Sequence, residues 1–165
     1  MNSLSLVLLP ETAADAAAIA KLNDRAFGPG RFARTAYRLR ENVAPDLSLS
    51  VIARVGTFLV GSNRMTPVRA GAAPALLLGP LAVEPAFRSR GIGEALVEHS
   101  LAAAREAGHK LVILVGDEPY YGRMGFRCVP PGRLTMPGPV DLSRLLHCEL
   151  VPGAFDGVSG PVTSG

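Results

Sequence analysis

Residues 81–96 constrain the fold of this chain more than any other segment. They read LAVEPAFRSRGIGEAL, which sets a β-forming run, a proline-bearing turn and a loop with two glycines directly before a helical pattern. Glycine lets backbone approach a ligand closely, and the first N–H groups of a helix have no partner within the helix. With the guanidinium groups of the loop, these features predict a cradle for a pyrophosphate.

Two common nucleotide-binding motifs do not fit this loop. A P-loop needs Gly-Lys-Ser/Thr after its glycines, whereas residues 91–95 read GIGEA. A dinucleotide fingerprint needs a third glycine where Leu96 stands, and it would open the first βαβ unit of a larger sheet. An incidental tight turn would account for the glycines but not for the flanking Arg88 and Arg90.

The remaining chain alternates between strand and helix patterns. The apolar run at residues 111–115 is typical of a strand buried on both faces, and the helix before it makes a right-handed βαβ unit with parallel strands. The arginines near residues 34–42 are interpreted as a solvated helix face. Strands are predicted over residues 5–9, 48–55, 57–68, 74–83, 111–115, 127–129 and 145–151, and helices over residues 12–27, 34–42 and 92–107.

These elements predict an α/β (layered α+β) fold with a mixed central sheet of about six or seven strands flanked by helices. Residues 1–155 are expected to form a single domain, and residues 156–165 a mobile or edge-covering tail. The apolar strand at residues 145–151 and this tail could pair across a homodimer.

Composition narrows the function classes. The net charge of +3 favours anionic ligands, but no basic stripe with interleaved aromatic residues is present, so nucleic-acid binding is disfavoured. Cys128 and Cys148 are isolated, which predicts free thiols and no metal site. No long apolar segment suggests membrane insertion, and a cytoplasmic protein is expected.

A second motif follows the strand at residues 111–115. Together the two motifs resemble the GCN5-related N-acetyltransferase (GNAT) superfamily. The acetyl-CoA motif Arg/Gln-x-x-Gly-x-Gly/Ala is matched by Arg88, Gly91 and Gly93, and a Tyr-x-x-x-Gly-Phe element by residues 121–126. The closing segment, residues 150–157, is similar to the YhbS-like bacterial subgroup.

The resemblance implies a cofactor site for acetyl-CoA, the acetyl donor, and no metal. In this family two central parallel strands splay apart and the pantetheine arm lies between them, which here would be the strands at residues 76–83 and 111–115. The resemblance places the cofactor against Leu81, Ala82, Val83, Arg88, Ser89, Arg90, Gly91, Ile92, Gly93, Glu94, Tyr120, Tyr121, Met124 and Phe126.

The resemblance also implies an N-acetyltransferase in which an amine attacks the thioester directly. Tyr121 matches the family position that protonates the departing thiolate, and the adjacent Tyr120 is the alternative. Glu84 is a candidate base, alongside Asp117 and Glu118, and a backbone N–H near Val83 would stabilise the oxyanion. A covalent route through Cys128 is disfavoured because no activating base is evident.

The acceptor stays open between a small amine, a protein amine and an aminoacyl group, in a pocket expected at residues 27–37 and 130–139. The rival function is a non-catalytic acyl-CoA binding or sensing module, which would keep the cradle but need no acid at Tyr121.

Overall fold

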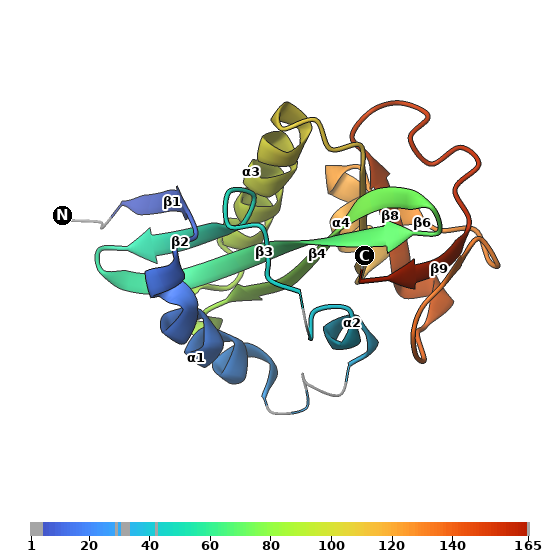
Figure 1. Cartoon of the computed structure of the whole chain (residues 1–165). Coiled ribbons are helices and arrows are strands. Elements are labelled where there is room, and N and C mark those ends of the chain that lie inside the picture. Colours follow the sequence, from blue (N-terminus) through green and yellow to red (C-terminus); the bar gives the residue numbers. More distant parts are fainter. Residues whose placement is uncertain (1–4, 29, 31–33, 42, 165) are drawn as a thin grey trace.

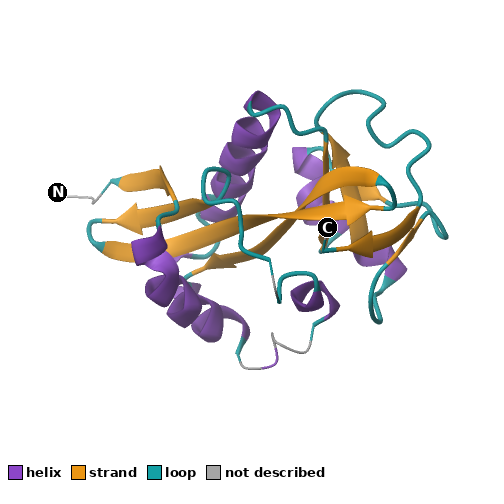
Figure 2. Cartoon of the chain, viewed as in Figure 1, coloured by secondary structure: helices purple, strands orange, loops and turns teal. Residues whose placement is uncertain are grey.

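A computed structural model describes residues 5–28, 30, 34–41 and 43–164. Pro29 and Asn42, at two predicted helix ends, lie outside the described residues. The strands are β1 Leu6–Pro10, β2 Val51–Val55, β3 Phe58–Ala70, β4 Ala73–Val83, β5 Leu111–Val115, β6 Arg127–Cys128, β7 Leu134–Thr135, β8 Leu145–Glu149 and β9 Gly160–Thr163. The α-helices are α1 Ala16–Phe27, α2 Thr35–Arg38, α3 Ile92–Glu106 and α4 Glu118–Tyr121 (Figures 1 and 2).

The sheet is mixed, as predicted, but it has nine strands rather than about six or seven. Its order is β1-β2-β3-β4-β5-β8-β6, and only the β4–β5 pair along this path is parallel. The additional strands β7 and β9 are short and come from segments whose prolines and glycines indicate loop or tail. They form strands because β9 pairs with β7 and with the end of β3, partners that are distant in the chain.

α1 and α3 cover opposite faces of the sheet. Side chains alternate between the two faces of a strand. Ile52 therefore packs with Ile19 and Leu22 of α1, whereas Val51 and Ala53 on either side pack with α3. Figure 1 shows α1 and α3 on the two sides of the central strands.

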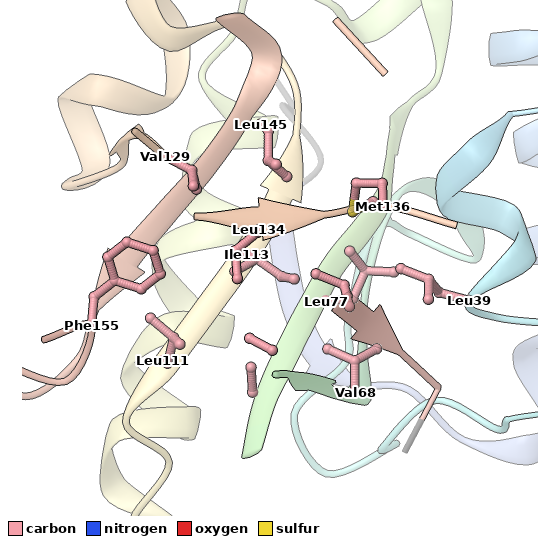
Figure 3. Packing of buried hydrophobic residues seen from close by; sticks show 13 residues of the cluster. Leu39, Val68, Leu77, Leu111, Ile113, Val129, Leu134, Met136, Leu145 and Phe155 are labelled. Atoms are coloured by element: carbon pink, nitrogen blue, oxygen red, sulfur yellow. The ribbon is translucent and has the colours of Figure 1, made fainter. Parts of the chain in front are cut away.

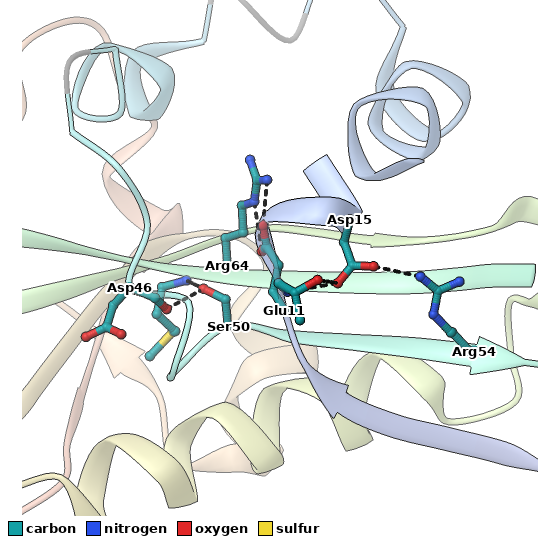
Figure 4. A network of polar contacts seen from close by, with 8 residues as sticks. Glu11, Asp15, Asp46, Ser50, Arg54 and Arg64 are labelled. Carbon is teal, nitrogen blue, oxygen red and sulfur yellow. Dashed lines mark hydrogen bonds and ion pairs between the residues drawn. The ribbon is translucent and has the colours of Figure 1, made fainter. Parts of the chain in front are cut away.

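α1 begins with the capping arrangement that the sequence predicts. The 3₁₀ turn η1 (Ala13–Asp15) leads into α1, and the Asp15 carboxylate accepts a hydrogen bond from the Thr12 backbone N–H at 2.8 Å. The same carboxylate pairs with Arg54 of β2 at 2.7 Å (Figure 4). The cap therefore also ties the helix to the sheet.

The C-terminal half of the sheet has its own core on one face. Leu77 and Ile113 from the parallel strands pack there with Phe155 and with Val162 of β9 (Figure 3). On the opposite face the sheet packs against Val97 and Leu101 of α3.

Two expectations from the sequence are wrong. The Arg-rich helix is only four residues long, because none of its side chains is fully buried and little packing stabilises further turns. Pairing of the last strands across a dimer is not available, since β8 lies between β5 and β6, while β9 pairs with β3 and β7 within the chain.

The two central parallel strands separate, as predicted. Their pairing is limited to Leu76 with Val112 and Leu77 with Ile113. Beyond it the β3–β4 register shifts so that Arg64 lies opposite both Gly79 and Pro80, a bulge that bends β4 away from β5. The free edge of β4 then borders the opening between the strands.

Candidate active site

The glycine loop forms a backbone cradle at the start of α3. Gly91 is the N-cap residue with φ of 78°, and Ser89 also has a positive φ of 64°. No side chain caps the helix, and its first backbone bond runs from Ala95 N–H to the Gly91 carbonyl at 3.1 Å. The N–H groups of residues 92–94 are thus not used by the helix and suit an anion.

This cradle lines a cavity of about 570 Å³. Ten of the predicted cofactor residues line it: Leu81, Ala82, Val83, Arg88, Ser89, Gly91, Ile92, Gly93, Glu94 and Tyr120. The structure thereby brings the end of β4, the loop and α4 together at one hollow.

Three predicted cofactor residues line neither this cavity nor the larger one described below. The Arg90 guanidinium instead lies over the Phe87 ring at 5.0 Å. Met124 packs against the core, and Phe126 is only 2% exposed within it. The Gly-Phe element therefore anchors α4 to the core, because the aromatic ring gains more from burial than from contact with a solvated ligand.

Gly93 is required at its position by Tyr120. A Cβ on Gly93 would lie 2.6 Å from the Tyr120 hydroxyl oxygen and 3.6 Å from Val83 Cγ2. The phenol therefore lies directly over the first turn of α3, which explains why the second glycine of the motif cannot be replaced without moving this side chain.

Tyr121, the last residue of α4, packs against the end of β5 in a largely apolar setting. Its ring meets the Phe126 ring edge-on with centroids 5.8 Å apart, and a Cβ on Gly116 would lie 2.5 Å from its Cε2 atom. Burial, helped by Tyr120 and Asp117, raises the pKa of Tyr121 to about 12. The hydroxyl is protonated at neutral pH and can donate a proton. Gly116 is a residue that the sequence analysis missed, because its contact with Tyr121 depends on tertiary packing.

Tyr120 stands between two cavities. Its ring lies edge-on to Tyr121 at 4.9 Å and under the Arg123 guanidinium at 5.1 Å. Burial and the nearby Glu94 carboxylate raise its pKa above the ordinary value. Tyr120 lines both the 570 Å³ cavity and the larger one, so the two cavities meet at this side chain.

The expected bases are already engaged. Glu84 accepts from Arg25 Nε at 2.9 Å and pairs with Arg25 Nη2 at 2.8 Å. It also lines neither cavity, which removes the geometric basis for its predicted role. Glu118 accepts from the Cys128 backbone N–H at 2.8 Å. Asp117 does line the larger cavity, and its contact with Arg144 is long, 3.3 Å, and exposed.

The larger cavity has a volume of about 950 Å³ and shares Phe27, Leu81 and Tyr120 with the cavity of the cradle. It includes parts of the predicted acceptor segments, such as Phe27, Tyr37 and Pro139. Its charged lining is strongly biased toward cations, with five arginines and two aspartates: Arg34, Arg38, Arg40, Arg64, Arg144, Asp117 and Asp141.

The arginines near residues 34–42 thus do not form a simple solvated face. Arg34, Arg38 and Arg40 all line the cavity, and Arg40 is partly buried. Their place in the site could not be predicted from the sequence, because a run of arginines in a short polar segment has the same pattern whether it faces water or a cavity.

Other candidate residues lie away from the cavities. His147 stacks on Phe155 with ring centroids 4.1 Å apart, and both cysteines are free. Among the described residues, no group of three or more His, Cys, Asp or Glu side chains is arranged to hold a metal ion. Within the same part of the chain, every helix is too short or too polar to cross a membrane.

Comparison with known proteins agrees with this architecture. The family described as "Acetyltransferase (GNAT) domain" matches residues 48–128. The uncharacterized N-acetyltransferase YhbS of Escherichia coli K12 is 28% identical over 159 residues, which is 95% of each chain.

Two solved structures are similar over most of the chain. YhbS from Escherichia coli in complex with CoA superposes with a TM-score of 0.83 at 26% identity, covering 99% of this chain and 91% of YhbS. A GNAT family acetyltransferase from Brucella melitensis in complex with acetyl-CoA gives a TM-score of 0.64 at 28% identity, covering 93% and 99%. With the splayed parallel strands and the glycine cradle, these similarities show that the chain belongs to the GNAT superfamily and is an N-acetyltransferase.

Proposed function

We propose that this protein transfers an acetyl group from acetyl-CoA to an amine by direct attack of the amine on the thioester. The observation that carries the proposal is that two cavities share Tyr120, one with the cradle and one lined by several arginines. Such an arrangement allows a long donor and a separate acceptor to approach each other from opposite sides.

The donor would bind along the cradle and the free edge of β4. The amides of residues 92–94 and the Arg88 guanidinium offer donors to the pyrophosphate oxygens. The unpaired edge of β4 offers backbone groups to the pantetheine amides. The complexes of YhbS with CoA and of the Brucella protein with acetyl-CoA support the choice of acetyl-CoA as the donor.

In the proposed reaction the amine nitrogen attacks the acetyl carbonyl carbon and a C–N bond forms. A backbone N–H near Val83 donates to the oxyanion, a contact worth about 3 kcal/mol in comparable sites. The C–S bond then breaks, and the Tyr121 hydroxyl protonates the thiolate. Its high pKa keeps the proton available until the thiolate forms.

The amine must lose a proton during the reaction. Asp117 is the carboxylate best suited to take it, because it lines the larger cavity and its side chain is 74% exposed to solvent. Glu84 is not proposed for this role, since its carboxylate is held by Arg25 outside the cavity.

The proposal is tested by measuring CoA thiol release from acetyl-CoA with a panel of amines. Tyr121→Phe is expected to lower kcat about 100-fold or more, because it removes the acid, while the Kd for CoA stays within about twofold. Tyr120→Phe is the matched control at the neighbouring ring and should retain most of kcat.

Equal loss in both variants would contradict the assignment of the acid to Tyr121. Tight CoA binding by the wild-type protein without thiol release for any amine would instead favour the acyl-CoA sensing module.

A further inference from the structure

Arg40 lies at the place where the parallel strands separate. It follows α2 and lines the larger cavity. A Cβ on Gly79 would lie 2.8 Å from Arg40 Nη2, so the guanidinium lies against the backbone of the β4 bulge. The bulge begins the opening between β4 and β5, and a ligand held by Arg40 would therefore lie next to the opening.

Unlike Arg38, Arg64 and Arg144, Arg40 has no side-chain hydrogen bond or ion pair within the described residues, and unlike Arg34, whose guanidinium lies over the Phe27 ring at 5.3 Å, it has no aromatic contact there either. Arg64 donates to both carboxylate oxygens of Glu11 at 3.1 and 2.8 Å (Figure 4). Arg144 pairs with Asp117, and Arg38 donates to the Pro137 carbonyl at 2.9 Å.

The Arg40 backbone bonds to Tyr37 and Val43, but no hydrogen bond or ion pair engages its guanidinium in the described part of the chain, and its Nε atom is buried without an acceptor. A guanidinium N–H that is buried without an acceptor is costly, because the solvation it loses on folding is not replaced. Burial, together with the positive charge of Arg64, lowers the pKa of Arg40 to about 10. The fold therefore holds at this point a cation that an anion would stabilise.

Among the described residues that line the cavity, no carboxylate pairs with the Arg40 guanidinium. Of the two aspartates that line the cavity, Asp117 contacts Arg144 and Asp141 accepts from the Ser143 backbone and hydroxyl. Asn23 of α1 also lines the cavity, and its Oδ1 atom is buried without a donor. The cavity thus holds an unused cationic donor, the Arg40 guanidinium, and an unused acceptor, the Asn23 Oδ1 atom. The guanidinium suits an oxyanion of a ligand, and the amide oxygen suits an amine.

We propose that the acetyl acceptor is a small amine that also carries an oxyanion, a carboxylate or a phosphate, and that Arg40 binds this oxyanion. The inference rests on the proposed function, because it names the substrate class of the same site. A cavity of about 950 Å³ lies in the range typical of small-molecule sites. The arginine bias disfavours polyamines and other acceptors with an additional positive charge.

The test compares acceptors that carry an oxyanion with analogues that lack it, each at a pH where the free-amine fraction is known. The twenty amino acids are each assayed against the corresponding α-carboxamide, and phosphoethanolamine against ethanolamine. We expect kcat/KM for at least one acid to exceed that of its neutral partner by about 10- to 100-fold, the range of a charge-assisted hydrogen bond. The pair that shows the preference distinguishes a carboxylate from a phosphate.

Arg40→Gln should abolish this preference, mainly through KM, and Arg40→Lys should restore part of it because the charge returns without the planar fork. Arg69→Gln is the matched control, since it removes the same charge from an exposed position on β3 whose guanidinium donates to the turn carbonyl of Ala72.

Arg40→Gln is also expected to leave the melting temperature equal or higher, because its guanidinium loses no protein partner. Equal kcat/KM for acids and neutral partners in the wild-type protein would overturn the inference while leaving the acetyltransferase function intact.

A binding measurement separates the two proposals if no amine is acetylated. With CoA present, N-acetyl amino acids should raise the melting temperature of the wild-type protein more than their amides do, and this difference should be absent in Arg40→Gln. A shift that is equal for acid and amide would overturn the inference regardless of turnover.

Discussion

At the scale of single residues, the site depends on glycines whose missing side chains make room for aromatic and guanidinium groups. Gly93 lies under the Tyr120 hydroxyl, Gly116 under the Tyr121 ring and Gly79 against Arg40. A Cβ atom added at any of the three glycines would lie less than 3.0 Å from the nearest atom of that neighbouring side chain. At Gly93, where the backbone is helical and the blocking atom is the end of the Tyr120 side chain, substitution should affect ligand binding before it affects folding, whereas the φ of 118° at Gly79 makes a side chain there strain the fold itself.

Gly93→Ala tests this expectation. The added methyl group would enter the cradle and displace the Tyr120 phenol, so we expect the Kd for CoA to rise about tenfold or more. The free energy of unfolding should change by less than about 1 kcal/mol, because alanine favours the helix and the phenol can move. Isothermal titration calorimetry and urea denaturation give the two quantities. Gly122→Ala, where a Cβ meets nothing closer than 4.0 Å, is the control, and an equal loss of CoA affinity there would argue against the contact.

At the scale of elements, the beginning of α1 joins a helix cap to the sheet. Asp15 is 6% exposed and binds both the Thr12 backbone and Arg54. Burial by itself would raise the pKa of Asp15, but the hydrogen bonds from Thr12 and the charge of Arg54 outweigh it and lower the pKa below the ordinary 3.8. The ionised carboxylate is therefore favoured in the folded state.

Asp15→Asn should lower the free energy of unfolding by about 1 kcal/mol at neutral pH, the usual effect of losing an N-terminal cap. Because the folded pKa is depressed, this contribution is fully present above pH 3.8 and is lost as the pH falls through the folded pKa. Urea denaturation of both proteins at about pH 7 and about pH 3 should show a smaller difference at the lower pH. Glu98→Gln, on the exposed face of α3, provides the control. A difference independent of pH would show that the charge is not responsible.

At the scale of the whole molecule, the last residues are integrated into the sheet. Val162 is 2% exposed, packs with Leu77 and Ile113 and pairs with Ala70 of β3. The C-terminal segment is also held by Arg133, which donates to the carbonyls of Phe155 and Val158. Residues predicted to lie outside the domain thus complete one of its cores.

Val162→Ala should lower the free energy of unfolding by about 1–3 kcal/mol through the loss of buried methyl groups. Thr163→Ala, at the adjacent exposed position of β9, should change it by less than about 0.5 kcal/mol. Chemical denaturation measures both. A dispensable tail would instead leave the stability unchanged in the two variants.

The site was predictable where local backbone chemistry decides it. The strand, glycine loop and helix at residues 81–96 lie as the sequence predicts, since strand propensity, positive φ at glycine and helix periodicity act over neighbouring residues. The predicted order of strands and helices around the parallel pair is likewise confirmed. The lengths of α2 and β9 were not predictable, because packing partners distant in the chain decide whether a short element forms.

The sequence by itself therefore determined the glycine loop at the start of α3, the parallel pair and the GNAT resemblance, because these depend on residue types at fixed short spacings. Only the tertiary structure decided which charges are free. It pairs Glu84 with Arg25 and Arg64 with Glu11, and among the described residues it leaves the Arg40 guanidinium without a partner against the β4 bulge. The physical reason is that solvation and pairing of a side chain depend on its neighbours in space, which a single sequence does not specify.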